Sequence, residues 1–212
     1  MGATMPAPRP SRMSPDERRS QLLREGLALF DQRSHDEVSI DDIAAAAGIS
    51  RGLLYHYFPT KRDYVLAVLR MAIDELTEQT APDPALDAEA QVNASIAAFL
   101  DYVREHAQGY ATLFRTRGGG DAAVRELLEA GRARRLEFIL EGIALLAGRP
   151  LEELRTPVLE AAAQGWMFFT EGVVLRWLEQ GEVTQEQVHG LMRLALGDVM
   201  RLAEGAVRAG AR

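Results

Sequence analysis

Residues 39–61, SIDDIAAAAGISRGLLYHYFPTK, constrain the fold more than any other part of the chain. Ser39 is a natural helix N-cap, and Asp42 can complete a capping box three residues later. Apolar residues follow at helical spacing up to Gly48, the residue type that most easily adopts the left-handed conformation of a helix end. Ser50 can then cap a second helix. The pattern predicts a helix-turn-helix, whose second helix enters the major groove of DNA.

The charge of the chain is unevenly distributed. Residues 1–70 carry ten Lys or Arg against nine Asp or Glu, whereas residues 71–212 carry fourteen against twenty-two. The formal net charge of −7 therefore comes from the second part of the chain. Because the local field decides where DNA binds, this sum does not exclude a DNA-binding first part.

Composition excludes several other kinds of site. The chain has no cysteine, which excludes disulfides, thiolate metal sites and cysteine nucleophiles. No apolar run near its start resembles a signal peptide. The most apolar stretch, residues 158–178, is interrupted by charged residues and predicts a buried or interface helix rather than a membrane span. We expect a cytoplasmic protein with no membrane partner.

Helical periodicity recurs along the chain, and no strand-like alternation persists. We therefore predict an all-α fold of about nine helices, four before the break at residues 81–84 and five after it. The five later segments are predicted at roughly 86–107, 109–116, 121–147, 152–180 and 184–208. Pro157 leaves the beginning of the fourth segment open, because the regular helix can begin at this residue.

The same breaks divide the chain into four parts. Residues 1–13, rich in Pro and Arg, are predicted to be a disordered basic tail. Residues 14–59 are predicted to form the helix-turn-helix domain, residues 60–80 a connecting helix, and residues 81–212 a second helical domain.

Residues 14–80 resemble the DNA-binding domain of the TetR family of bacterial transcriptional repressors. The stretch LLYHYFPTKRDYVLAVL at 53–69 is similar to the family's signature for the recognition helix and the helix after it, and SIDDIAAAAGISRG at 39–52 supplies the preceding half. The resemblance implies a three-helix DNA domain joined to an all-α domain that binds a small-molecule effector and dimerises. It also implies a homodimeric repressor that binds a palindromic operator and is released by its effector.

The resemblance further implies which residues contact DNA. Carried over by position, they are Ser39, Ser50, Arg51, Gly52, Leu53, Tyr55, His56, Tyr57 and Lys61. Arg51 can bond O6 and N7 of guanine together, or it can hold a phosphate, and both roles remain open. Leu53 replaces a threonine found in many relatives, so its contact becomes apolar. Lys61 is expected to bind a phosphate.

Helical geometry predicts how the aromatic residues of the recognition helix are oriented. Leu54 and Phe58 lie four residues apart and are expected to form a core pair. This arrangement leaves His56 and Tyr57 outward, with Tyr55 partly packed.

A single recognition helix reads few base pairs, so a two-fold dimer is expected. The last two predicted helices are apolar on more than one face, which favours a four-helix bundle between subunits over a core within one chain. The expected interface residues are Trp166, Val173, Trp177, Leu191, Ala195, Val199 and Leu202.

Aromatic residues are frequent in the second domain, and the resemblance implies that some of them line an effector cavity. The residues expected there are Phe99, Tyr102, Tyr110, Phe114, Phe138, Gln164, Trp166, Phe169 and Thr170. Polar groups among apolar neighbours, including Gln164, Thr170 and Glu171, can orient a ligand. We expect an apolar or amphipathic effector, such as a lipid or an acyl thioester. Arg115 and Arg117 can meet an anion or lie in an exposed basic loop, and we favour the loop.

Two other functions remain open on the sequence. Glu186 and His189 have the spacing of a di-iron ligand pair, but no second pair and no phosphate-binding glycine motif is found. A helical enzyme or metal-binding protein is therefore the weaker alternative. A further alternative is an architectural DNA-binding protein without an effector. We expect no catalytic residue, metal ion or cofactor.

Overall fold

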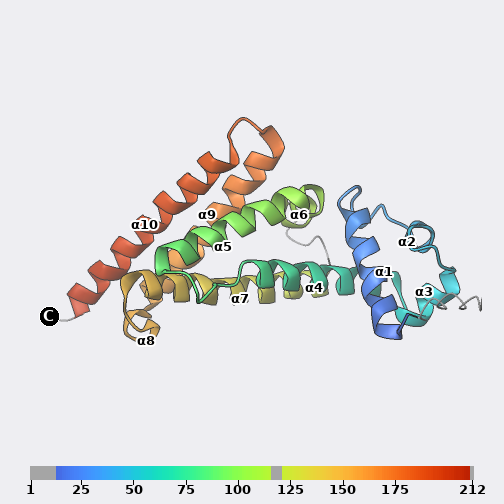
Figure 1. The fold of residues 1–212 in the computed structure, drawn as a ribbon, viewed down its shortest axis with the longest axis horizontal. Coiled ribbons are helices and arrows are strands. Elements are labelled where there is room, and N and C mark those ends of the chain that lie inside the picture. The colour runs from blue at the N-terminus through green and yellow to red at the C-terminus, as the bar shows by residue number, and fades with distance from the viewer. Residues whose placement is uncertain (1–12, 116–120, 211–212) are drawn as a thin grey trace, which may run out of the picture.

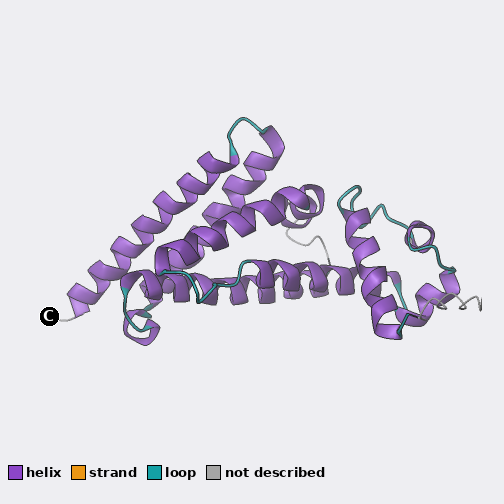
Figure 2. Cartoon of the chain, in the orientation of Figure 1, coloured by secondary structure: helices purple, strands orange, loops and turns teal. Residues whose placement is uncertain are grey.

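Residues 13–115 and 121–210 are described by the computed structural model of the chain (Figure 1). The regular structure in these residues is entirely helical (Figure 2), which confirms the predicted all-α class. The helices are α1 (Pro15–Phe30), α2 (Ile40–Ala46), α3 (Arg51–Tyr57), α4 (Lys61–Gln79), α5 (Ala88–Glu105), α6 (Ala107–Arg115), α7 (Ala122–Ala147), α8 (Leu151–Leu154), α9 (Pro157–Gln180) and α10 (Gln185–Gly210). The predicted tail, apart from Met13, and the loop with Arg117 lie outside the described residues.

The described residues form ten helices rather than about nine, and a proline explains the difference. Pro157 lacks a backbone N–H and cannot continue a helix from the preceding turn, so α9 begins at this residue. Thr156 caps it, because its hydroxyl accepts a hydrogen bond from the Leu159 amide. Residues 151–154 consequently form α8, a separate helix of one turn.

The helices of the first part begin where the local sequence predicts. Ser39 and Asp42 form a reciprocal capping box at α2, and equivalent boxes begin α1 and α4. Each box satisfies two backbone amides that a helix start leaves without partners. The positions of these helices therefore follow from residues only three apart in sequence.

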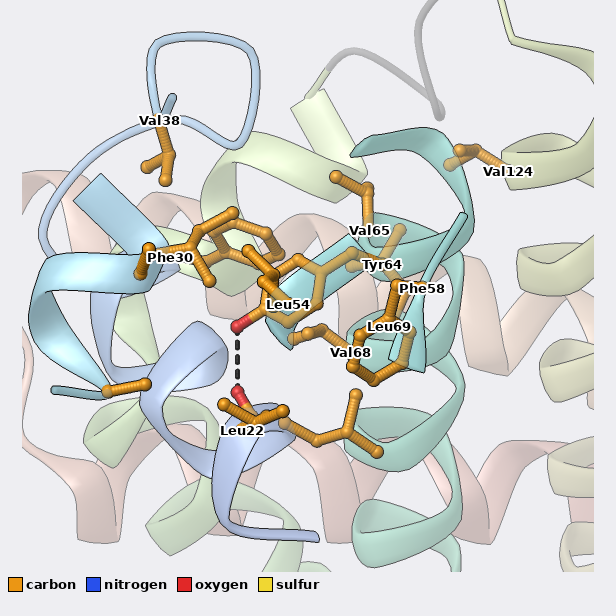
Figure 3. Packing of buried hydrophobic residues seen from close by; sticks show 14 of the residues in the cluster. Leu22, Phe30, Val38, Leu54, Phe58, Tyr64, Val65, Val68, Leu69 and Val124 are labelled. Carbon is orange, nitrogen blue, oxygen red and sulfur yellow. Dashed lines mark hydrogen bonds between the residues drawn. The ribbon is translucent and has the colours of Figure 1, made fainter. Parts of the chain in front are cut away.

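Helices α1, α2, α3 and α4 enclose one core in the N-terminal part of the molecule, to which α7 contributes Val124 and Leu128 (Figure 3). Leu22, Leu54 and Tyr64 are fully buried in it. The Tyr64 hydroxyl donates a hydrogen bond of 2.7 Å to the Leu22 carbonyl oxygen and so joins α4 to α1. Gly26 allows this approach, because a Cβ atom added there would lie 2.3 Å from the Tyr64 hydroxyl.

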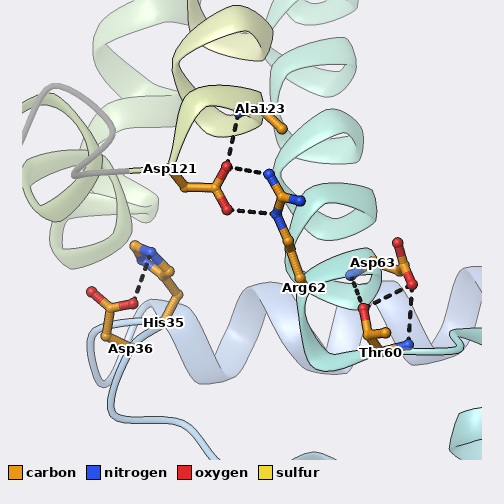
Figure 4. A network of polar contacts seen from close by, with 7 residues as sticks. All are labelled: His35, Asp36, Thr60, Arg62, Asp63, Asp121 and Ala123. Atoms are coloured by element: carbon orange, nitrogen blue, oxygen red, sulfur yellow. Dashed lines mark hydrogen bonds and ion pairs between the residues drawn. The ribbon is translucent and has the colours of Figure 1, made fainter.

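Helix α4 runs from this core along the long helix α7, while α9 and α10 form an antiparallel pair on the other side of α5 (Figure 1). Two ion pairs join α4 to α7. Arg62 binds Asp121 through two contacts of 2.7 Å (Figure 4), and Arg134 binds Asp74 at 2.8 Å. No helix in the described part of the chain is long and apolar enough to cross a membrane.

Candidate nucleic-acid interface and effector cavities

A tight turn connects α2 to α3. Gly48 has a φ of 62°, the left-handed conformation that the sequence predicts, and its amide donates to the Ala45 carbonyl. The next amide, of Ile49, donates to the Ala44 carbonyl, so the last turn of α2 has partners for its carbonyl groups. Ser50 then caps α3 by accepting from the Leu53 amide. These bonds fix the angle at which α3 leaves α2.

One side of α3 is buried and the other faces solvent. Leu54 and Phe58 have exposed fractions of 0% and 2%, which confirms the expected core pair. The remaining surface of α3 presents Arg51, Leu53 and Tyr55, all exposed. Gly52 and His56 are exposed as well. The helix thus offers a surface of mixed polar and aromatic character that nothing in the described part of the chain covers.

The two tyrosines of α3 are oriented differently from the prediction. Tyr55 was expected to be partly packed, yet 40% of it is exposed. Tyr57 was expected to point outward, but it is half-buried against the core. The reason is helical geometry: Tyr57 lies three residues after Leu54 and shares its side, whereas Tyr55 is turned by about 100°. The expected outward pair is therefore corrected to Tyr55 and His56.

The basic residues expected at DNA have protein partners in the free chain. An oxygen of Asp41 on α2 lies 3.3 Å from the Arg51 guanidinium. Both side chains of this pair are exposed, and such pairs contribute little to stability, so a DNA base or phosphate can displace Asp41 at small cost. The Lys61 ammonium donates to the Asp36 carbonyl oxygen at 3.1 Å and thereby holds the loop before α2. Sequence reasoning did not anticipate either partner.

Two adjoining cavities lie between the helices of the second part. The larger has a volume of about 300 Å³ and is enclosed by α5, α7, α9 and α10. The smaller, of about 70 Å³, lies between α1, α4, α6 and α7. Thr80, Arg135 and Phe138 line both. Most of the larger cavity wall is apolar, as expected of a small-molecule site.

Seven of the nine residues predicted for the effector cavity line one of these spaces. Those in the smaller cavity are Tyr102, Tyr110, Phe114 and Phe138, and those in the larger are Phe99, Phe138, Trp166 and Thr170. Gln164 and Phe169 line neither cavity, because they lie exposed on the outer side of α9. Because α9 carries apolar residues on several sides, their spacing in the sequence did not distinguish its inner side from its outer side.

Polar groups near the cavities are mostly paired. Glu171 binds the Arg132 guanidinium through two contacts of 3.1 Å. The Asp31 carboxylate at the end of α1 contacts the His106 ring at 2.7 Å, and this bond raises the pKa of His106 above its usual value. Burial raises the pKa of the Tyr110 phenol to about 12. Of the two roles open to Glu171 on the sequence, to orient a ligand or to stabilise the fold, this ion pair fits the structural one.

Much of the interface predicted on the last two helices lies inside one chain. Trp177 and Val199 are buried, and the Trp166 indole donates to the Met192 carbonyl oxygen at 3.0 Å. Val173 and Ala195 are half-buried. The large apolar side chains that face outward on α9 and α10 are Val158, Phe168, Phe169, Leu191, Leu194 and Leu202, with exposed fractions of 58%, 49%, 39%, 44%, 73% and 55%. We call these six residues the α9–α10 apolar face; of them, only Leu191 and Leu202 were among the predicted interface residues.

Glu186 and His189 have the sequence spacing of a di-iron ligand pair, but the structure does not place them in a metal site. The His189 ring lies 3.3 Å from the Asn93 carbonyl oxygen. Within residues 13–115 and 121–210, no group of three or more potential ligands is placed to hold a metal ion.

Comparison with known proteins relates both parts of the chain to one family. Residues 22–68, from α1 into α4, match the model of bacterial regulatory proteins of the tetR family. Residues 88–198, just over half of the chain, match a tetracyclin repressor-like C-terminal domain.

Individual relatives agree with this assignment. The transcriptional activator FasR of Mycolicibacterium smegmatis is 34% identical over 108 residues, which cover 50% of this chain and 49% of FasR. The regulator EthR of the same organism is 34% identical over 122 residues, covering 58% and 51%. The chain thus spans about half the length of these curated relatives.

A solved structure extends the likeness to almost the whole fold. The tetR-family transcriptional regulator from Streptomyces coelicolor superposes with a TM-score of 0.75 at 29% identity, over 91% of this chain and 90% of that chain. With its exposed α3, its cavities and both family models in agreement, the chain belongs to the TetR family of bacterial regulatory proteins.

Proposed function

We propose that this protein is a transcription regulator that binds operator DNA through α3 and responds to a small-molecule effector. The observation that carries this proposal is the two-sided character of α3. Leu54 anchors one side of the helix in the core, while Arg51, Leu53 and Tyr55 face solvent at the positions where the family's recognition helix meets DNA. A helix held in this way can enter a major groove without changing the core.

The division of labour along the chain belongs to the same proposal. Residues 14–59 bind DNA, residues 60–80 connect, and residues 81–212 bind the effector and dimerise. Arg51 exchanges Asp41 for guanine or phosphate, with Tyr55 and His56 beside it. The remaining contacts come from the helix starts at Ser39 and Ser50, from Gly52, Leu53 and Tyr57, and from Lys61.

A homodimer is the proposed binding form. α3 has only seven residues and reads few base pairs, whereas two copies related by a two-fold axis can read a palindrome with half-sites about 34–36 Å apart. The α9–α10 apolar face supplies a self-complementary surface of the kind that two-fold dimers use.

The position of the cavities suggests how an effector acts. Leu27 and Phe30 of α1 and Leu69 of α4 form part of the wall of the smaller cavity, so a ligand there touches the helices that carry α3. A coupling of only about 1–3 kcal/mol changes DNA affinity by about 5- to 150-fold. The relative FasR is named an activator, so DNA binding alone does not decide between activation and repression of transcription. We propose repression that the effector relieves.

Selection of bound sequences from random duplex DNA, followed by fluorescence anisotropy on the enriched sequence, tests the proposal. The variant Arg51→Ala/Tyr55→Ala is expected to lose specific binding, by about 10- to 100-fold for each lost base contact, with an unchanged far-ultraviolet helical signal. Arg149→Ala, which removes an arginine at the far end of α7, serves as the matched control and retains binding. Failure to enrich any sequence, or equal binding by both variants, would contradict the proposal.

A further inference from the structure

Arg135 of α7 lies where the two cavities meet. It lines both of them. Its guanidinium carbon is 5.0 Å from the centre of the Phe99 ring, which lines the larger cavity. The charge of Arg135 also acts on the hydroxyl of Tyr110, which lines the smaller one. The charged end of Arg135 therefore sits between the mostly apolar larger cavity and the smaller cavity, whose wall also holds Asp31, His106 and Arg132.

This guanidinium lacks the partners that a buried charge usually has. Its Nη1 nitrogen is buried and has no hydrogen-bond partner among the residues that the structure describes, and the same is true of the Tyr110 hydroxyl and of one carboxylate oxygen of Asp31 in the smaller cavity. Buried charged donors without partners are unfavourable, and proteins seldom keep them without a reason. Two of these three groups, the Arg135 guanidinium and the Tyr110 hydroxyl, lie near one another and can both donate to an acceptor.

The neighbouring charges leave Arg135 as the uncompensated one. Arg132, one turn earlier on α7, is neutralised by Glu171, and Asp31 in the smaller cavity is paired with His106. No ion pair joins Arg135 to a carboxylate within the described ranges of the chain. Of the two arginines that line the cavities, Arg135 is therefore the one that a ligand can neutralise, while Glu141, the carboxylate in the wall of the larger cavity, is exposed to solvent.

Building on the proposed effector function, we propose that the effector is an amphipathic monocarboxylate: its carboxylate binds Arg135 and the Tyr110 hydroxyl, and its aliphatic chain fills the larger cavity. A planar guanidinium binds a carboxylate through two parallel hydrogen bonds, and the phenol donates a further one. One unpaired cation matches a singly charged carboxylate better than a phosphate, whose second charge would remain uncompensated. Ile96, Ile139 and Leu196 offer the chain an apolar wall.

Calorimetric titration of the full-length protein without DNA tests this site. The probes are straight-chain monocarboxylates from six to fourteen carbons, each compared with the primary alcohol of the same length. We expect at least one carboxylate to bind more tightly than its alcohol. In Arg135→Gln its affinity should fall by about 10- to 150-fold, the usual effect of losing hydrogen bonds to a charged group, while the affinity for the alcohol changes little.

Two further variants separate charge from folding. Arg134→Gln removes the same charge one residue earlier on α7, where the side chain points to solvent and pairs with Asp74, and it should bind as the wild type does. Arg135→Lys keeps the charge but loses the two-pronged geometry, so its affinity should lie between those of the wild type and Arg135→Gln. If Arg135→Gln fails to fold, the wild type and Arg135→Lys can still be compared. Their relative affinities for the acid and the alcohol then test whether the Arg135 guanidinium binds the carboxylate.

The result that overturns the inference is a series in which no carboxylate binds better than its matched alcohol, or in which Arg135→Gln binds the carboxylates as tightly as the wild type does. Because DNA is absent from the titration, this failure is separate from failure of the proposed function. A protein that binds carboxylates through Arg135 but enriches no DNA sequence would contradict the regulator proposal alone. A protein that binds an operator but prefers alcohols would contradict the inference alone.

Discussion

Two residues decide how closely α1 approaches α4. The Tyr64 hydroxyl donates to the Leu22 carbonyl in a fully buried position, and Gly26 leaves the space that the phenol occupies. A methyl group at residue 26 would lie 2.3 Å from the hydroxyl and 2.7 Å from a methyl group of Val68. This contact sets the position of α1, which in turn forms a wall of the smaller cavity.

At this residue scale, a double-mutant cycle has a definite expected result. Tyr64→Phe should lower the free energy of unfolding by about 1 kcal/mol through the lost hydrogen bond. Gly26→Ala should lower it by about 1–3 kcal/mol because the added methyl group overpacks the core. In the double variant the hydroxyl, the nearest atom, is gone, while the overlaps with the ring Cζ of residue 64 and with Val68 remain, so the total loss should be smaller than the sum. Urea denaturation measures all three values.

Gly52→Ala is the control for this cycle. A Cβ atom at Gly52 would meet nothing nearer than the Ser50 hydroxyl at 3.9 Å, so alanine there should raise stability by up to about 1 kcal/mol. Strict additivity at residues 26 and 64, or an equal gain from alanine at 26 and 52, would show that α1 does not lie against Tyr64 as described.

At the scale of single elements, the sequence predicted helix starts well because their determinants are local. The capping pairs of α1, α2 and α4 lie three residues apart, and Pro157 marks the beginning of α9 by its own chemistry. The recognition helix was located for the same reason, and its core pair Leu54 and Phe58 was confirmed.

The partner against which a helix packs depends on elements distant in sequence, so the sequence did not predict how α9 and α10 pack. Apolar spacing indicated that α9 and α10 bury a face, but it did not show that Trp177 and Val199 are covered by their own chain. It also placed Phe169 in the cavity and overlooked Arg135, because the cavities arise where helices distant in sequence meet. Arg135 stands in the charged run RARRLE at 132–137, so no local pattern distinguished it from the neighbouring arginines.

The cap of α2 leads to a prediction about acid stability. Hydrogen bonds from Ser39, with the nearby Arg33, hold the pKa of Asp42 at about 2, below its ordinary value of 3.8. A carboxylate with a lowered pKa in the folded state stabilises the protein fully above about pH 4, and this contribution is lost as the pH falls through about 2. Asp42→Asn should therefore be less stable than the wild type at pH 5, and the gap should close towards pH 2.

Urea midpoints at pH 5, 4, 3 and 2 measure this gap. Other carboxylates titrate in the same range, but they are common to both proteins and cancel in the difference. In a Ser39→Ala background the pH-dependent part of the gap should shrink, because the hydroxyl, the first cause of the lowered pKa, is gone while the backbone amide of residue 39 still donates. A gap that stays constant from pH 5 to 2 would mean that Asp42 does not act through the cap.

At the scale of the whole molecule, the two functional ends are joined by charged and buried contacts rather than by a flexible linker. Arg62 and Asp121 join the beginnings of α4 and α7, and His106 joins α6 to the end of α1 through Asp31. Asp31 and His106 themselves line the smaller cavity. A ligand that displaces α4 relative to α7 therefore also moves the core on which α3 rests, which is the geometry that linkage between effector and DNA requires.

The α9–α10 apolar face gives the last prediction, on the oligomeric state. Leu194 is 73% exposed, so glutamate at this position is tolerated in a monomer but places an unpaired charge in a two-fold interface, once from each copy. Leu194→Glu should weaken dimerisation by at least about 100-fold, and sedimentation should shift towards the 23.4 kDa of one chain.

Val183→Glu, in the turn between α9 and α10 and 44% exposed, is the matched control and should remain dimeric. In the proposed dimer two copies of α3 read a palindrome, so Leu194→Glu should also lose operator affinity while its helical signal is unchanged. A variant that sediments as a dimer would place the subunit contact elsewhere on the molecule.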